Sequence, residues 1–189
     1  TGMGKAVKLS KLLHAPFTLH KQTIAMIDRE TEAATSGQKA HIMAKVNGLT
    51  ERKVIKALYR ASQAGVKIDL LVRGMCCLRP GVAGVSDNIR VVSVVGRFLE
   101  HSRVYYFQNS EPQVFCSSAD LMERNLINRI EVCFPILTEK LANRVKKELD
   151  QFFSDNCQSW QLRADGHYVL NQPKQGQDRR SVQESMLEK

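Results

Sequence analysis

The chain has 189 residues, of which 43% are hydrophobic, and its formal net charge is +9, with 28 Lys and Arg against 19 Asp and Glu. The length predicts one domain with a buried core, and the hydrophobic content excludes a chain that is disordered throughout. The charge favours an anionic partner, such as a nucleotide, another polyanion, nucleic acid or an acidic membrane surface, without choosing among them.

The cysteines and the start of the chain bear on where the protein works. Five cysteines are present, and Cys76 and Cys77 are adjacent, so neither a disulfide framework nor a CxxC zinc pattern is indicated. We interpret them as reduced thiols of a cytosolic protein. No apolar run approaches the roughly 18 residues of a membrane-spanning helix, and there is no leader-like core. Because the sequence begins at Thr1 rather than Met, we expect a fragment of a longer protein.

The first half of the chain predicts alternating strands and helices. Thr18 and Thr50 are good N-cap residues, and Gly37 and Gly65 stand where helices are expected to end. The expected order is a strand at 8–14, a helix from Thr18 to about Gly37, a strand at 41–47, a helix between Thr50 and Gly65 and a strand at 66–72. This alternation predicts βαβ crossovers and a largely parallel sheet.

The second half predicts more strands, one long helix and a tail. Residues 73–88 form a long loop, of a length that is usually functional or disordered. Strands are expected at 89–95, 114–116 and 129–137, and the stretch 96–107 is expected to be a short basic turn that leads into a further strand. A final helix is expected over 141–153. Residues 158–189 are expected to form a basic, mobile tail, since their second half is rich in Gln, Lys and Arg and lacks periodicity.

Basic and polar residues follow or begin several of these strands. Arg73 stands at the carboxyl end of the most apolar strand, where open α/β sheets place their ligands. His101 and Arg103 lie two positions apart at the start of a strand, so they are expected to project from the same face. The set that we expect on one rim of the sheet is completed by Lys45, Asn47 and the loop 117–124.

Guanidinium, amide, hydroxyl and imidazole groups together suit phosphate chemistry. A Walker loop is absent, since the stretch 81–84 lacks the Gly-Lys-Ser/Thr ending. Glu100 and Asp120 lie in different loops beside basic groups and do not predict a paired-carboxylate site. A solvated basic strand end is the other interpretation of the His101 region, and composition leaves both open.

Residues 101–103 and 117–120 resemble half of a phospholipase D-type site. That family's pattern is His-x-Lys, four residues, Asp, and then Gly-Ser-x-Asn. The places of its lysine, aspartate, glycine and asparagine are taken here by Arg103, Gln108, Ser117 and Asp120. These departures argue against a phospholipase or nuclease, and against His101 as the nucleophile of that family.

A narrower family fits these departures, because the chain resembles the last domain of bacterial polyphosphate kinase, the ATP:polyphosphate phosphotransferase. The resemblance covers most of residues 1–155. It is carried by the segments 45–47, 59–66, 72–81, 86–90, 96–101, 117–120 and 124–125. It implies an α/β, phospholipase D-like domain over residues 1–157, with a mixed, largely parallel sheet flanked by helices, followed by the tail 158–189.

The resemblance also implies an activity. Members of the family transfer the terminal phosphate of ATP reversibly to a growing inorganic polyphosphate chain, with Mg²⁺, through a phosphohistidine in the preceding domain. That domain and its magnesium-site arginines are not in this sequence, so no metal ligand is expected here. Arg73 matches the family's arginine for the nucleotide phosphates, and His101 matches its second essential histidine and is the expected catalytic group. Arg103 and Arg124 are weaker candidates for lining the phosphate path, from position alone.

The implied partners are ATP or ADP, inorganic polyphosphate, the preceding domain and, in the full-length protein, further copies of the same chain. Nucleic acid is not expected, and the expected location is the cytoplasm or the inner surface of the inner membrane. Two alternatives stay open: a phospholipase D-like phosphodiesterase or nuclease, and a non-catalytic polyanion-binding module. The chain alone is expected to lack kinase activity.

Overall fold

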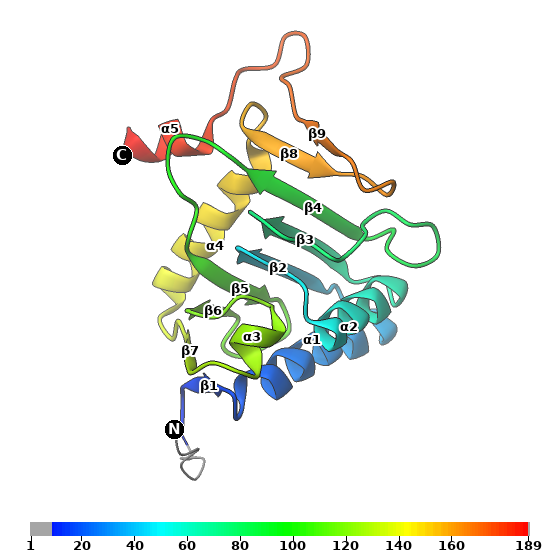
Figure 1. Ribbon diagram of the computed structural model, residues 1–189, viewed down its shortest axis with the longest axis vertical. Coiled ribbons are helices and arrows are strands. Elements are labelled where there is room, and N and C mark those ends of the chain that lie inside the picture. Colours follow the sequence, from blue (N-terminus) through cyan, green and yellow to red (C-terminus); the bar gives the residue numbers. More distant parts are fainter. Residues whose placement is uncertain (1–8, 189) are drawn as a thin grey trace.

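The computed structural model describes residues 9–188 and shows one mixed β-sheet with helices on both faces (Figure 1). In the described part, nine strands follow the order β1-β7-β6-β5-β2-β3-β4-β8-β9 across the sheet. The strands are β1 (Leu13–Ala15), β2 (His41–Val46), β3 (Lys67–Val72), β4 (Ile89–Val94), β5 (Arg103–Phe107), β6 (Val114–Ser117), β7 (Glu131–Pro135), β8 (Ser159–Leu162) and β9 (Tyr168–Leu170). The helices are α1 (Leu19–Thr35), α2 (Arg52–Gln63), α3 (Glu123–Leu126), α4 (Glu139–Ser154) and α5 (Val182–Leu187). None of these helices is both long and apolar enough to cross a membrane.

The parallel part of the sheet is confined to its centre. β2 pairs with β3, and β3 with β4, in parallel, whereas the other six pairings are antiparallel. The predicted mixed α/β sheet is confirmed, but its description as largely parallel is wrong. A parallel neighbour needs a crossover such as α2 between β2 and β3, while the short turns after β5 and β8 can return the chain only antiparallel.

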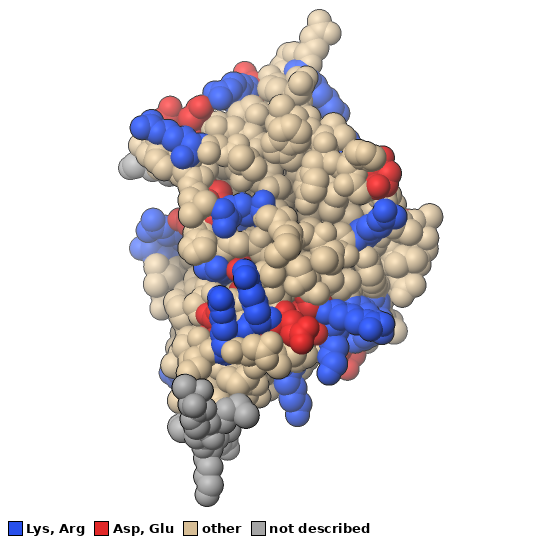
Figure 2. Space-filling view, viewed as in Figure 1, with Lys and Arg blue, Asp and Glu red and all other residues tan. Residues whose placement is uncertain are grey.

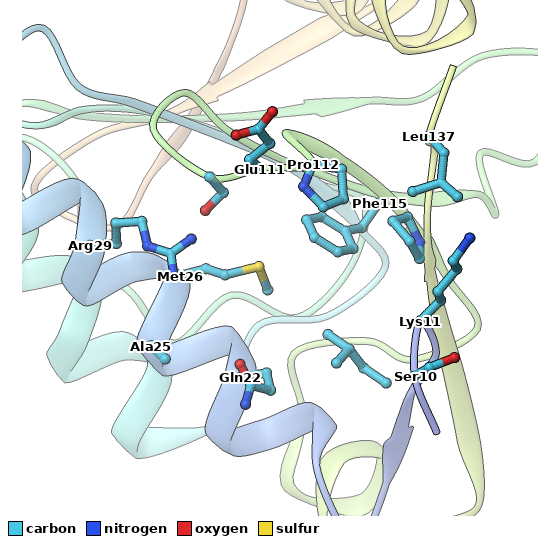
Figure 3. Close-up of a pocket in the computed structure, with 13 residues that line it drawn as sticks. Ser10, Lys11, Gln22, Ala25, Met26, Arg29, Glu111, Pro112, Phe115 and Leu137 are labelled. Carbon is cyan, nitrogen blue, oxygen red and sulfur yellow. The ribbon is translucent and has the colours of Figure 1, made fainter. Parts of the chain in front are cut away.

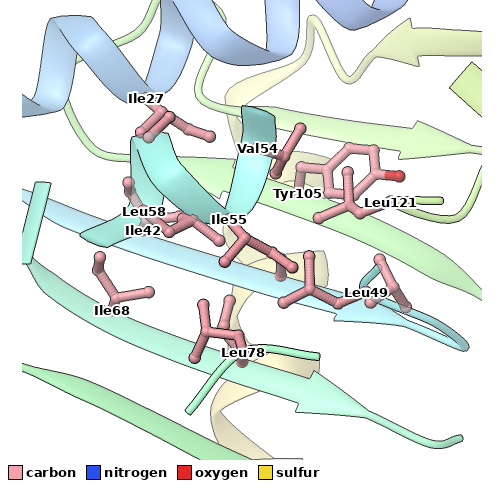
Figure 4. Close-up of a cluster of buried hydrophobic side chains, with 14 of the residues drawn as sticks. Ile27, Ile42, Leu49, Val54, Ile55, Leu58, Ile68, Leu78, Tyr105 and Leu121 are labelled. Carbon is pink, nitrogen blue, oxygen red and sulfur yellow. The ribbon is translucent and has the colours of Figure 1, made fainter. Parts of the chain in front are cut away.

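Apolar side chains cover both faces of the central strands. Successive residues of β2 face opposite sides of the sheet: Ile42 packs under α1 and α2, and Met43 packs under α4. Figure 4 shows Ile27 of α1 and Leu58 of α2 lying over Ile42 and Ile68 of the sheet. Burial on both faces explains why β3 has a nearly continuous apolar sequence.

The glycines predicted to end the first two helices are confirmed, whereas the predicted N-caps at their starts differ. Gly37 and Gly65 have φ angles of 77° and 95°, the left-handed conformation that ends a helix. At the start of α2 the predicted cap Thr50 is wrong, because Glu51 is the N-cap and its carboxylate accepts a 2.7 Å hydrogen bond from Val54 N. Thr18 holds the N-cap position of α1, but its hydroxyl accepts from His14 N instead of capping the helix.

The C-terminal segment is folded onto the sheet, which corrects the prediction of a mobile tail from residue 158. β8 pairs with β4, β9 pairs with β8, and α5 packs near α4 (Figure 1). Val182 in α5 is 3% exposed. The sequence signal was weak because β8 and β9 form a short, largely exposed sheet edge, where few apolar positions are needed. The first predicted strand is also shortened to Leu13–Ala15, and its beginning at Lys8 lies outside the described residues.

Candidate phosphate-binding site

Several loops meet at the rim of the sheet where β2 and β3 end and β5 begins. Leu49 forms backbone bridges with Cys76 and with Leu121, which join the loops after β2, β3 and β6. The approach is close, since a Cβ atom on Gly74 would lie 2.9 Å from the carbonyl oxygen of Asn47. β5 is antiparallel to β2, so its first residue, Arg103, reaches the same rim. The expected convergence on one rim is therefore observed.

Asn47 is the hub of this rim. Its side-chain oxygen accepts a 2.8 Å hydrogen bond from Nε of Arg73. Its backbone nitrogen donates to Oδ1 of Asp120 over 2.6 Å, and its side-chain nitrogen donates to the same oxygen and to the carbonyl of His101. Asn47 thus connects the end of β3, the loop after β6 and His101, which lies two residues before β5.

Arg103 donates a hydrogen bond from each of its three nitrogens to neighbours within the chain. Nε and Nη2 donate to the two carboxylate oxygens of Asp120 over 3.1 and 3.0 Å, and Nη1 donates to the His101 carbonyl over 3.0 Å. Burial alone would raise the pKa of Asp120, but the hydrogen bonds from Arg103 and Asn47 lower it below its ordinary value. The hydrogen bond to Asp120 raises the pKa of Arg103, so the pair is ionised. Arg103 therefore holds the rim together, with a hydrogen bond to a neighbour from each of its three nitrogens.

Lys45 lies under the loop that leads into β5. It is 3% exposed, its Nζ lies 3.0 Å from Oε2 of Glu100, and it also donates to the hydroxyl of Ser102. Its ammonium stands over the ring of Phe152, 4.7 Å from the centroid. Burial lowers the pKa of Lys45, and the hydrogen bond to Glu100 opposes that shift. Lys45 therefore anchors the loop from below.

Arg73 is the cation of this rim whose terminal nitrogens have no carboxylate partner among residues 9–188. It lies between two open clefts. The first, of about 380 Å³, is lined by Arg73, Arg97, Phe98 and Glu100 among others. The second, of about 360 Å³, is lined by Arg73, Ser93, Trp160 and Tyr168 among others. Trp160 and Tyr168 were not predicted to line this site, because no motif surrounds these two aromatic residues in the sequence.

His101 lies just before β5 rather than in it, so the prediction that it shares a strand face with Arg103 is wrong. Its side chain is exposed and makes no hydrogen bond within the described range, whereas its carbonyl accepts from Arg103 and Asn47. The backbone of His101 is therefore held while its ring remains available. Arg124 is exposed in α3 and shares no hydrogen bond or ion pair with this rim across residues 9–188.

The carboxylates of the rim do not fit a divalent cation. Glu100 is paired with Lys45 and Asp120 with Arg103, so their charges are already neutralised. No group of three or more His, Cys, Asp and Glu side chains suited to a metal occurs in the part of the chain that is described. The residues here suit anion binding, and they do not suit Mg²⁺ coordination.

Charged side chains and a cavity away from this rim are arranged differently. On the face seen in Figure 2, basic and acidic side chains mix in several small groups rather than forming one basic surface. A cavity of about 270 Å³ lies between α1, β1 and the turn before β6, lined by residues that include Met26, Arg29, Glu111 and Phe115 (Figure 3). It lies at the edge of the sheet away from Arg73, because the turn between β5 and β6 is at the opposite end of β5 from Arg103.

The fold is that of a phospholipase D-like domain. The structure is similar to a phospholipase D family member, Nuc from Salmonella typhimurium, with a TM-score of 0.58 over 81% of this chain and 97% of that chain. The sequence identity is 16%, so this likeness shows the fold alone. A family model described as polyphosphate kinase C-terminal domain 2 matches residues 12–183, and the chain belongs to that family.

Its relatives agree with this assignment. The chain is 60% identical over all of its length to a polyphosphate kinase of Pseudomonas aeruginosa, and 52% identical over 98% of its length to one of Neisseria gonorrhoeae. The crystal structure of the polyphosphate kinase of Porphyromonas gingivalis matches 98% of the chain at 36% identity with a TM-score of 0.92. The chain spans 27% of the two curated relatives and 28% of the solved one. The family match also runs well past the expected boundary at residue 157.

Proposed function

We propose that this chain forms the C-terminal part of the catalytic site of a polyphosphate kinase, which transfers the terminal phosphate of ATP reversibly to a growing polyphosphate chain. The observation that carries the proposal is Arg73, a half-buried arginine with free terminal nitrogens at the end of a central strand. Family membership supports the same reaction, with ATP or ADP and polyphosphate as the substrates.

Arg73 would bind the nucleotide phosphates. Its Nε is held by Asn47, which fixes the plane of the guanidinium and leaves both terminal nitrogens to donate to phosphate oxygens. A pre-oriented cation of this kind neutralises charge on the transferring phosphoryl group without reorganisation during the reaction. Arg103 supports this role indirectly, because with Asp120 it fixes Asn47 and the His101 carbonyl.

His101 would act on a phosphate oxygen at the same rim. An imidazole can hydrogen-bond to that oxygen or give it a proton, and the ring of His101 is exposed and unpaired in the described chain. The phosphohistidine that accepts the phosphoryl group is proposed to lie in the preceding domain. The Mg²⁺ ligands are assigned to the same domain, since both rim carboxylates here are paired with cations.

Two further parts of the proposal rest on the family resemblance. The full-length protein is proposed to be a homo-oligomer, and it is proposed to work in the cytoplasm or at the inner surface of the inner membrane. The five cysteines are free, which agrees with a reducing compartment.

A phospholipase D-like phosphodiesterase is disfavoured by the residue that takes the place of that family's lysine. Arg103 stands there, and all three of its nitrogens are bound to Asp120 and the His101 carbonyl. These contacts direct the guanidinium of Arg103 toward its own chain.

The test is nucleotide binding by the chain itself. Titration calorimetry with ATP should show weak binding that Arg73→Ala removes and that Arg144→Ala, on the exposed face of α4, leaves unchanged. The chain alone should make no polyphosphate. Equal ATP affinity in wild type and Arg73→Ala, or turnover of a phosphodiester, would contradict the proposal.

A further inference from the structure

The loop of residues 95–102, between β4 and β5, carries Glu100 and His101 but buries none of its own side chains. Val95, Phe98 and Leu99 are 60%, 45% and 69% exposed. Apolar packing therefore does not fix the conformation of this loop. Its position depends on polar contacts, which come from outside the loop.

Gln183, at the start of α5, provides three of these contacts. Its Oε1 accepts a 3.0 Å hydrogen bond from the backbone nitrogen of Phe98, and its Nε2 donates over 2.9 Å to the Phe98 carbonyl. The same Nε2 donates over 2.7 Å to Oε1 of Glu100, whose other oxygen faces Lys45. The loop is thus held from two sides, by buried Lys45 and by Gln183. Of the neutral side chains of this length, only an amide can both donate and accept in this way.

Gln183 is itself rigidly placed. It is 5% exposed, and the preceding Val182 packs in an apolar cluster with Val92 of β4 and Phe152 of α4. The backbone nitrogen of Val182 donates over 2.9 Å to the buried carboxylate of Asp155. The hydrogen bonds from Gln183 therefore connect the loop to the core.

The space around Gly96 also shows how closely Gln183 packs against this loop. A Cβ atom there would lie 2.4 Å from Oε1 of Gln183 and 3.0 Å from Oε1 of Gln158. Gly96 is not among the glycines with positive φ, so the backbone conformation does not require glycine. A side chain at position 96 would therefore displace the amide group of Gln183.

We propose that Gln183 is a positioning residue for the phosphotransferase reaction: it holds the loop 95–102 and so sets the place of His101 together with Asn47 and Arg103, which bind the His101 carbonyl. This inference rests on the proposed function. The ring of His101 has no hydrogen bond of its own across residues 9–188, so its place follows from the backbone of the loop. Arg73, at the end of β3, is held by Asn47, and Gln183 takes no part in that contact. Loss of Gln183 therefore disturbs His101 and spares nucleotide binding.

The first test substitutes Gln183→Met in the full-length polypeptide that carries this chain, because Met keeps the length and removes both hydrogen-bonding groups. The kcat for polyphosphate synthesis should fall about tenfold to a hundredfold, the effect of a displacement near 1 Å, while the KM for ATP changes less than about threefold. Gln177→Met, at an exposed glutamine of the same segment, is the control and should resemble wild type. A kcat for Gln183→Met equal to that of the control would overturn the proposal.

The second test measures the loop directly, so it does not depend on the proposed reaction. In Gln183→Met, hydrogen exchange at the Phe98 amide should accelerate while the amides of β4 and β5 keep their protection. Gly96→Ala should produce the same acceleration in the wild type and a clearly smaller one in the Gln183→Ala background, where the clash is gone. Unchanged exchange at Phe98 would overturn the proposal. If exchange at Phe98 accelerates in Gln183→Met but the wild-type polypeptide makes no polyphosphate, the positioning role stands and the proposed function is rejected.

Discussion

The Nε of Arg73 donates a 2.8 Å hydrogen bond to Oδ1 of Asn47, and Asn47 in turn donates to Asp120 and to the His101 carbonyl. This one amide connects the proposed phosphate-binding arginine to the loop of the proposed catalytic histidine. The orientation of Arg73 therefore depends on a residue that does not itself need to touch a phosphate.

Asn47→Ala should weaken ATP binding by about tenfold, since a hydrogen bond to a charged group contributes about 1.5 kcal/mol or more. Titration calorimetry on the chain measures this effect. Asn143→Ala, at an exposed asparagine of α4, is the matched control. Equal affinities of the two variants would show that Arg73 is oriented without Asn47.

Asp120→Ala should destabilise the fold by about 3 kcal/mol, because it leaves the partly buried guanidinium of Arg103 without its partner. Arg103→Ala in the same chain should restore part of that loss, since the unpaired charge is then gone. Urea unfolding of the two single variants and the double variant provides the comparison. Additive losses would mean that the pair is not coupled.

Asp69 should make stability sensitive to acid. Burial would raise its pKa, but His41, Arg90 and Lys67 lower it from 3.8 to about 2. Because the folded-state pKa lies below the unfolded value, the stabilisation, about 2 kcal/mol, is complete well above pH 4 and is lost as pH falls toward 2. Urea unfolding at several pH values should show wild type and Asp69→Asn converging over that range. Asp28→Asn, in an exposed pair with Arg60, should show no such convergence.

Glu51→Ala should lower the free energy of unfolding by about 1 kcal/mol, the usual contribution of an N-cap. Thr50→Ala, one residue earlier, should cost clearly less because the Thr50 side chain does not cap α2. Denaturant unfolding of both variants measures the difference. A larger loss for Thr50→Ala would contradict the assignment of the cap.

Patterns within one element were the most predictable part of the fold and site. The apolar run of β3 identified a buried central strand and so placed Arg73 at its carboxyl end. The glycines at 37 and 65 marked helix ends because few other residues adopt positive φ. The family resemblance came from long motifs and required no geometry.

The remaining features depend on contacts between distant segments. The side chains of Thr50 and Glu51 both carry oxygens that could accept a hydrogen bond from the first turn of α2. Which of them is the N-cap depends on the residue at which the helix begins. Gln183 lies 85 residues from the Phe98 that it binds, in a segment whose polar composition suggested mobility. The engagement of Arg103 by Asp120 likewise appears only when β5 and the loop after β6 are brought together.

The most direct test of the account is polyphosphate synthesis by the full-length polypeptide with Arg73→Ala or His101→Ala, each compared with its thermal unfolding. Arg73 uses one nitrogen in the fold and the His101 side chain uses none in the described chain, so each variant should lose synthesis and keep a melting temperature close to that of wild type. Synthesis near the wild-type rate would contradict the account, and a large drop in melting temperature would show that these residues are structural instead.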